Sequence, residues 1–81
     1  QMQASDAAMT ASYKDALAHA ADPATKKYLA RSQTAWVTYR DAWCEATVSR
    51  SGSLARLKLM ECRIDETKKR TAALTNLAAP Q

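Results

Sequence analysis

Only three residues in this 81-residue chain strongly break helices: Pro23, Gly52 and Pro80. The runs between them are rich in alanine, lysine, arginine, leucine and glutamate, which are good helix formers. With so few breakers, long helices are the simplest arrangement that the chain can adopt. The sequence therefore predicts an all-α fold, a three-helix antiparallel arrangement in a single domain covering residues 1–81, with helices at about residues 5–20, 23–50 and 54–78.

Capping residues lie at the predicted helix boundaries. Ser5 or Asp6 can cap the first helix, and Asp22 can cap the second, with a proline at its first helical position. Gly52 can take the left-handed conformation that ends a helix, and Ser53 can cap the third helix. The short connection at Gly52 makes the second and third helices antiparallel neighbours.

Each predicted helix carries a stripe of mostly apolar residues at helical spacing. In chain order the three stripes are Met9, Tyr13, Leu17 and Ala20 with Ala16 beside them; Leu29, Ser32, Trp36, Tyr39, Trp43 and Ala46; and Leu57, Met60, Ile64, Thr67, Thr71, Leu74 and Ala78. We expect these stripes to meet in the core. For Trp36, Tyr39 and Trp43, a partner-binding aromatic patch is the alternative interpretation.

The two cysteines bracket the predicted turn. Cys44 precedes Gly52 and Cys62 follows it, so a hairpin bent at the glycine brings both to nearly the same height on facing helices. A disulfide between them would close a loop worth about 3 kcal/mol in the chain-entropy model. It would also indicate an oxidising compartment. Two buried free thiols are an alternative, and a metal or catalytic site is a further one, with His19 as the only histidine.

Charge and motif content exclude several classes of protein. The net charge of +4 comes from 12 basic and eight acidic residues, a modest excess that does not form a nucleic-acid-binding tract. No apolar run approaches the ~20 residues that cross a membrane, and we expect no signal peptide within the sequence. No phosphate-binding loop, catalytic triad or metal-ligand cluster is present. We therefore expect no enzyme activity and no cofactor.

The densest part of the chain resembles a known family. Residues 33–44, QTAWVTYRDAWC, are similar to the Q-x-x-W-x-x-Y-R-D-x-x-C core of the LprI-like lysozyme inhibitors, which are small secreted bacterial helical proteins. The second half reproduces the family's C-x4-T-x2-R-x3-L pattern. The motif residues of the two halves are Gln33, Trp36, Tyr39, Arg40, Asp41, Trp43 and Cys44, then Cys62, Thr67, Arg70 and Leu74. Family members often carry further cysteines near the N-terminus, which this chain lacks.

The assumed hairpin places several polar motif residues at one level. Gln33, Arg40, Thr67 and Arg70 are expected to form one polar cluster beside the aromatic residues. Arg40 and Asp41 are adjacent and point about 100° apart, so we do not expect them to pair. Instead, Arg40 is expected to reach an acidic residue on the third helix, as a structural ion pair in preference to a ligand clamp.

The resemblance implies a periplasmic or secreted bacterial protein that inhibits lysozyme by protein–protein contact. Typical lysozymes are cationic and so is this chain, so the contact would have to use its acidic residues. The candidates are Asp6, Asp15, Glu61, Asp65 and Glu66. The alternative function is a basic envelope-associated module that binds anionic polymers or a membrane surface through residues 50–70.

Overall fold

The computed structural model describes residues 2–49 and 52–78, and over these residues the chain is helical apart from short connections. The elements are α1 (Met2–His19), α2 (Pro23–Val48), the 3-10 helix η1 (Gly52–Leu54) and α3 (Ala55–Ala78). The prediction of an all-α fold with three helices is confirmed. The predicted end of the second helix, residue 50, lies outside the described residues, as does Pro80.

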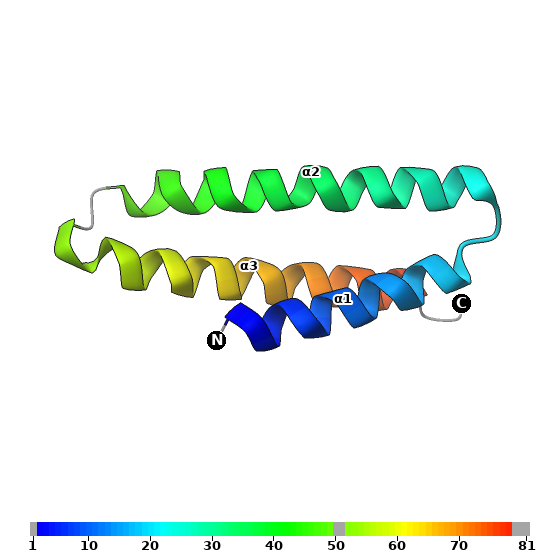
Figure 1. Cartoon of the computed structure of the whole chain (residues 1–81), viewed down its shortest axis with the longest axis horizontal. Helices are drawn as coiled ribbons and strands as arrows, with labels where there is room; N and C mark the ends of the chain where they lie inside the picture. Colours follow the sequence, from blue (N-terminus) through cyan, green and yellow to red (C-terminus); the bar gives the residue numbers. More distant parts are fainter. Residues whose placement is uncertain (1, 50–51, 79–81) are drawn as a thin grey trace.

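The three helices form an elongated molecule with two different halves (Figure 1). Helices α2 and α3 run antiparallel as a long hairpin, and the Cα trace extends 47 Å along its longest axis. Helix α1 lies along the C-terminal half of α3 and begins near the middle of the hairpin. We call residues 2–40 and 64–78 the three-helix half, and residues 41–49 and 52–63 the two-helix half.

The predicted boundary signals are correct at two of the connections. The Asp22 Oδ1 atom accepts a hydrogen bond of 2.7 Å from the backbone N–H of Thr25, and Pro23 follows at the start of α2. The hydrogen bonds from Thr25 stabilise the charged carboxylate and lower the pKa of Asp22. Gly52 has a φ of 61°, the left-handed conformation expected for the turn.

Two predicted caps are wrong. Helix α1 begins at Met2, so Ser5 and Asp6 lie within the helix. Ser5 is buried there, and Asp6 makes an ion pair described below. Ser53 lies inside η1, because the chain enters α3 through a 3-10 turn.

The apolar core lies in the three-helix half. Its buried residues are Met9, Ala16, Leu29, Leu74 and Ala78, and Tyr13, Leu17 and Trp36 pack against it partly buried. A hydrogen bond of 3.2 Å between the hydroxyls of Ser12 and Thr75 also joins α1 to α3. The predicted stripe of the first helix and the C-terminal part of the third stripe therefore face the core.

The core prediction fails for parts of the second and third stripes. Leu57 and Met60 of α3 are 57% and 47% exposed, because α1 begins too far along the hairpin to cover them. On α2, Tyr39 and Trp43 are 53% and 46% exposed, and Ser32 and Ala46 are also exposed. Helix α2 instead buries the neighbouring face that carries Arg40 and Cys44.

Candidate functional site

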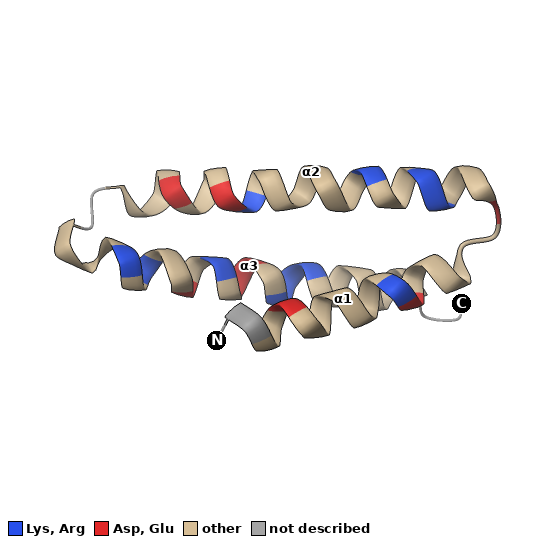
Figure 2. Ribbon diagram, viewed as in Figure 1, with Lys and Arg blue, Asp and Glu red and all other residues tan. Residues whose placement is uncertain are grey.

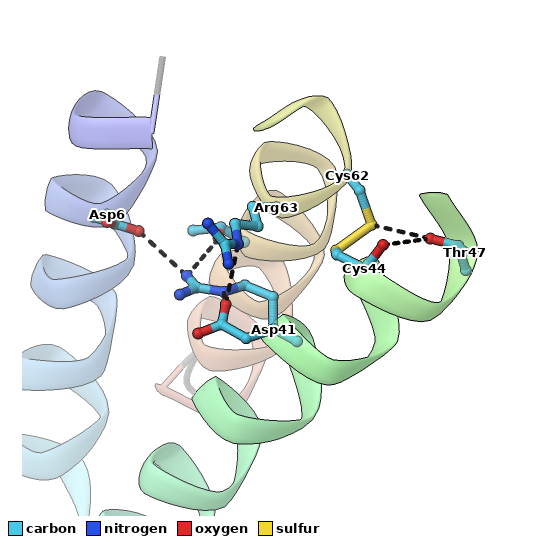
Figure 3. Close-up of polar contacts among 8 residues, drawn as sticks. Asp6, Asp41, Cys44, Thr47, Cys62 and Arg63 are labelled. Atoms are coloured by element: carbon cyan, nitrogen blue, oxygen red, sulfur yellow. Dashed lines mark hydrogen bonds and ion pairs between the residues drawn. A yellow bond between two sulfur atoms is a disulfide. The ribbon is translucent and has the colours of Figure 1, made fainter. Parts of the chain in front are cut away.

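A disulfide joins the two helices of the two-helix half. Cys44 of α2 and Cys62 of α3 are bonded, with their Cα atoms 5.6 Å apart, so the predicted pairing is confirmed (Figure 3). The Thr47 hydroxyl donates a hydrogen bond of 3.1 Å to the carbonyl of Cys44 and lies 3.8 Å from the sulfur of Cys62. Cys44 is fully buried. The bridge therefore fixes which face of α2 points at α3.

Arg40, the residue one turn before Cys44, is buried on the same face of α2. Its Nη1 atom donates a hydrogen bond of 3.2 Å to the hydroxyl of Thr67 on α3, and Thr67 is itself fully buried. The same nitrogen lies 3.5 Å from a carboxylate oxygen of Asp6 on α1 (Figure 3). A single side chain of α2 thus contacts both other helices at the junction between the two halves.

Asp41 provides a second negative charge beside Arg40. Its Oδ1 atom accepts a hydrogen bond of 2.9 Å from the Nε atom of Arg40, and Arg63 Nε of α3 lies 3.3 Å from the same oxygen as an ion pair. The expectation that Arg40 and Asp41 would not pair is therefore wrong. Although their Cα–Cβ bonds diverge, the long arginine side chain turns back to the neighbouring carboxylate. We expected an acidic partner for Arg40 on α3, but its acidic partner on another helix is Asp6 of α1.

Arg70 of α3 makes the corresponding contacts one level further into the three-helix half. It donates hydrogen bonds of 2.9 Å to the side-chain oxygen of Gln33 and 2.8 Å to the hydroxyl of Ser32. Partial burial lowers the pKa of the Arg70 guanidinium, which still remains protonated at neutral pH. Together these bonds attach the middle of α3 to α2.

Trp36 lies between the two arginines. The guanidinium carbons of Arg40 and Arg70 are 5.3 Å and 5.8 Å from the centre of its ring. Cations at this distance from an indole face are attracted by the ring's quadrupole. The structure therefore places Arg40 and Arg70 against one tryptophan, with the predicted residues Thr67 and Gln33 as their hydrogen-bond partners. Leu74 lies buried in the adjoining core.

Two motif residues lie outside this cluster. Tyr39 and Trp43 are on the exposed side of α2, where their rings stack with centroids 6.3 Å apart and planes inclined by 13°. They do not contribute to the core that we predicted for them. Their position makes them available to a partner.

We call the polar side chains that join the helices here the inward cluster: Asp6, Ser32, Gln33, Arg40, Asp41, Arg63, Thr67 and Arg70. The sequence did not predict the contacts of Ser32, Asp6 and Arg63 within it. Asp6 and Arg63 belong to other helices than Arg40. Their contact with the motif depends on how the helices pack, and no local spacing signals it. Ser32 was predicted to belong to the core stripe. It is instead the neighbour of Gln33, and both residues accept hydrogen bonds from Arg70.

No metal centre is assembled among the described residues. They contain no group of three or more histidine, cysteine or acidic side chains that could hold a metal ion. His19 is exposed, with its Nδ1 atom 2.8 Å from the carbonyl oxygen of Asp15. A shallow hollow of about 280 Å³ between α1 and α3 is lined by Ala4, Ser5, Ala8, Lys68 and Thr71. In the described part of the chain, no helix is long and apolar enough to span a membrane.

Fold and site together define a small all-α protein built on a disulfide-linked helical hairpin, with its motif residues used mainly to join helices. Residues 1–74 match the family described as lysozyme inhibitor LprI. Because the match covers most of the chain, the protein belongs to the LprI family. Comparisons with curated proteins and with solved structures found no match.

Proposed function

We propose that this protein binds lysozyme and inhibits it by direct contact, without catalysing a reaction. Membership of the LprI family is the observation that carries this proposal. The inward cluster supports it indirectly, because Arg40, Arg70 and the disulfide are engaged in holding the helices and leave binding to the outer surface.

A cationic enzyme would need an acidic contact on this cationic chain. Several of the predicted acidic residues already have partners: Asp6 pairs with Arg40, Glu66 with Lys69, and Asp15 lies beside His19. Glu61 and Asp65 are exposed and form no ion pair with another described residue.

The two remaining carboxylates share one side of α3. Leu57, Glu61 and Asp65 follow one another at four-residue spacing and are all exposed, and we call them the acidic face. An exposed leucine beside two carboxylates offers both an apolar contact and attraction to basic groups. Because Lys58 and Lys68 border this face, it is not strongly acidic overall. Its two carboxylates would therefore orient a cationic partner more than they would attract it from a distance.

A lysis assay with reversed charges tests the proposal. A molar excess of the wild-type protein should slow lysis of bacterial cells by lysozyme, and a direct titration should give heat of binding. Replacing both carboxylates, E61K with D65K, should weaken inhibition more than tenfold, because like charges then meet at the contact.

The matched control is D15K, an exposed acidic position on α1, which should leave inhibition intact. If the wild type neither inhibits nor gives heat at low or moderate salt, lysozyme is not the partner. If D15K weakens inhibition as much as the pair does, net charge acts and the acidic face has no special role.

A second candidate function is binding to anionic envelope polymers or membrane surfaces. Its support is a set of exposed cations on α3, namely Arg56, Lys58, Lys68 and Lys69 (Figure 2). Co-sedimentation with an anionic polymer or with anionic vesicles should then be lost at high salt. Retention by the polymer together with no effect on lysis would favour this candidate over the first.

We also infer a periplasmic or extracellular location. The disulfide supports it, because structural disulfides persist in oxidising compartments and are rare in the cytosol. Fractionation of cells that express the natural gene would test it, and recovery of the reduced protein from the cytoplasm would contradict it.

A further inference from the structure

Helix α2 carries an uncharged stripe on its exposed side. Its members follow one another in alternating steps of four and three residues, which is the spacing of a coiled-coil seam. We call this set the α2 stripe: Tyr28, Ser32, Ala35, Tyr39, Ala42 and Ala46. All six are exposed, although the hydroxyl of Ser32 also accepts a hydrogen bond from Arg70 at the inner edge of the stripe. Trp43 borders the stripe with its ring stacked on Tyr39. A continuous exposed stripe that carries two tyrosines is a candidate surface for binding another molecule.

We propose that a second copy of this chain covers the α2 stripe, with the two α2 helices packed antiparallel about a two-fold axis at Val37. Residues equally far before and after Val37 then face each other. Tyr28 faces Ala46 of the second copy, and Ala35 faces Tyr39. Ser32 and Ala42, both small, face each other in the same way. Each tyrosine thus meets an alanine, so the large and small side chains can interdigitate.

The charges beside the stripe are also self-complementary. The exposed basic residues of α2 lie in its N-terminal part, whereas Asp41 and Glu45 lie toward its C-terminal end (Figure 2). Arg31 and Glu45 are on the same flank of the stripe, and the antiparallel arrangement brings Arg31 of one copy near Glu45 of the other. The two-fold axis makes this pair twice. A parallel arrangement would instead place like charges together.

The available area fits a reversible dimer. Tyr28, Tyr39 and Trp43 are 64%, 53% and 46% exposed. Since an aromatic side chain buries about 150–250 Å², roughly 100 Å² of each remains free, or roughly 600 Å² over two copies. The alanines and the flanking charges extend the contact toward the ~1,000 Å² that separates specific interfaces from incidental ones. We therefore expect dimers to form at micromolar or higher concentration.

Sedimentation equilibrium of the full, disulfide-bonded chain tests the proposal. The mass should rise from one to two copies with increasing concentration. In the variant A35E a carboxylate stands at the centre of the contact, and the protein should remain monomeric. The matched control is A30E, the same substitution at an exposed position on the opposite side of α2, which should dimerise like the wild type. Circular dichroism should show the same helix content in all three.

Charge reversal tests the antiparallel register. R31E and E45R should each weaken the dimer about tenfold, since each places like charges together, and the double variant R31E/E45R should restore it. A wild type that stays monomeric, a dimer that A35E leaves intact, or a double variant that does not recover would each overturn the proposal. A monomeric wild type whose lysozyme inhibition is lost in A35E would overturn it too, by assigning the stripe to the enzyme.

Discussion

In the three-helix half, Leu29 of α2 and Leu74 of α3 pack against α1 and exclude water, whereas in the two-helix half Leu57 and Met60 stay exposed. The two-helix half has only two elements, which cannot enclose an apolar interior. Its helices are held by a covalent bond and by ion pairs at its junction with the rest of the molecule. The difference teaches that this short chain is stabilised by apolar burial at one end and by cross-links at the other.

The largest expected difference is between two leucine-to-alanine variants, one in each half. Leu74→Ala should lower the free energy of unfolding by about 2–5 kcal/mol, because it removes a fully buried side chain and leaves a cavity. Leu57→Ala, at an exposed position of the same helix, should change it by no more than about 0.5 kcal/mol. Urea unfolding of both variants measures the difference. Equal losses would show that the two halves do not differ in apolar packing.

Removing the disulfide should affect the two-helix half most. The double variant C44A/C62A should lose about 3 kcal/mol, the value expected for a loop of this size. Hydrogen exchange should show that amides of residues 41–49 and 52–63 lose more protection than those of α1. Wild-type protein treated with a reductant is the control and should behave alike. A uniform loss over all three helices would mean that the halves unfold as one unit.

A smaller effect is expected at the junction of the halves. Asp41→Asn takes one of two carboxylates from the buried Arg40 and also leaves Arg63 without this partner, while Asp6 remains. Because Asp41 itself is partly exposed, the expected loss is about 1–2 kcal/mol. Glu61→Gln, at an exposed carboxylate, should cost less than about 0.5 kcal/mol in the same urea experiment. Indistinguishable variants would show that the ion pairs at the junction add nothing to stability.

The sequence was sufficient to predict the three helices and the Cys44–Cys62 disulfide. Breakers and caps are local signals, so Asp22 with its following proline and Gly52 place two boundaries correctly. The disulfide could be predicted because Cys44 and Cys62 lie at similar sequence distances before and after the turn at Gly52. The N-terminus of α1 was less predictable, because nothing near Ser5 distinguishes a cap from a serine buried within a helix.

The rotation of α2 could not be predicted from helical spacing. Spacing alone permits either of two faces about 100° apart, one with Tyr39 and Trp43 and the other with Arg40 and Cys44. Apolarity favours the first, yet the second is buried, where Cys44 is bonded to Cys62 and Arg40 has partners on both other helices. Those partners are remote in sequence, so the choice depends on the packed structure.

The exposure of Leu57 and Met60 agrees with the unequal lengths of the helices. Helix α1 has 18 residues, whereas α2 has 26. At 1.5 Å per residue, the difference leaves about 12 Å of the hairpin without a third helix. Leu57 and Met60 lie in that stretch, so α1 does not cover them.

The two cysteine residues of the bridge differ in burial. Cys44 is fully buried, whereas Cys62 is only partly buried. An attacking thiolate therefore meets the Cys62 sulfur first, forming a mixed disulfide there and releasing Cys44 as the leaving thiolate. A thiolate released in a buried position is poorly stabilised, because its charge loses the hydration that it would have in water. The folded protein thereby protects its own cross-link against thiol exchange.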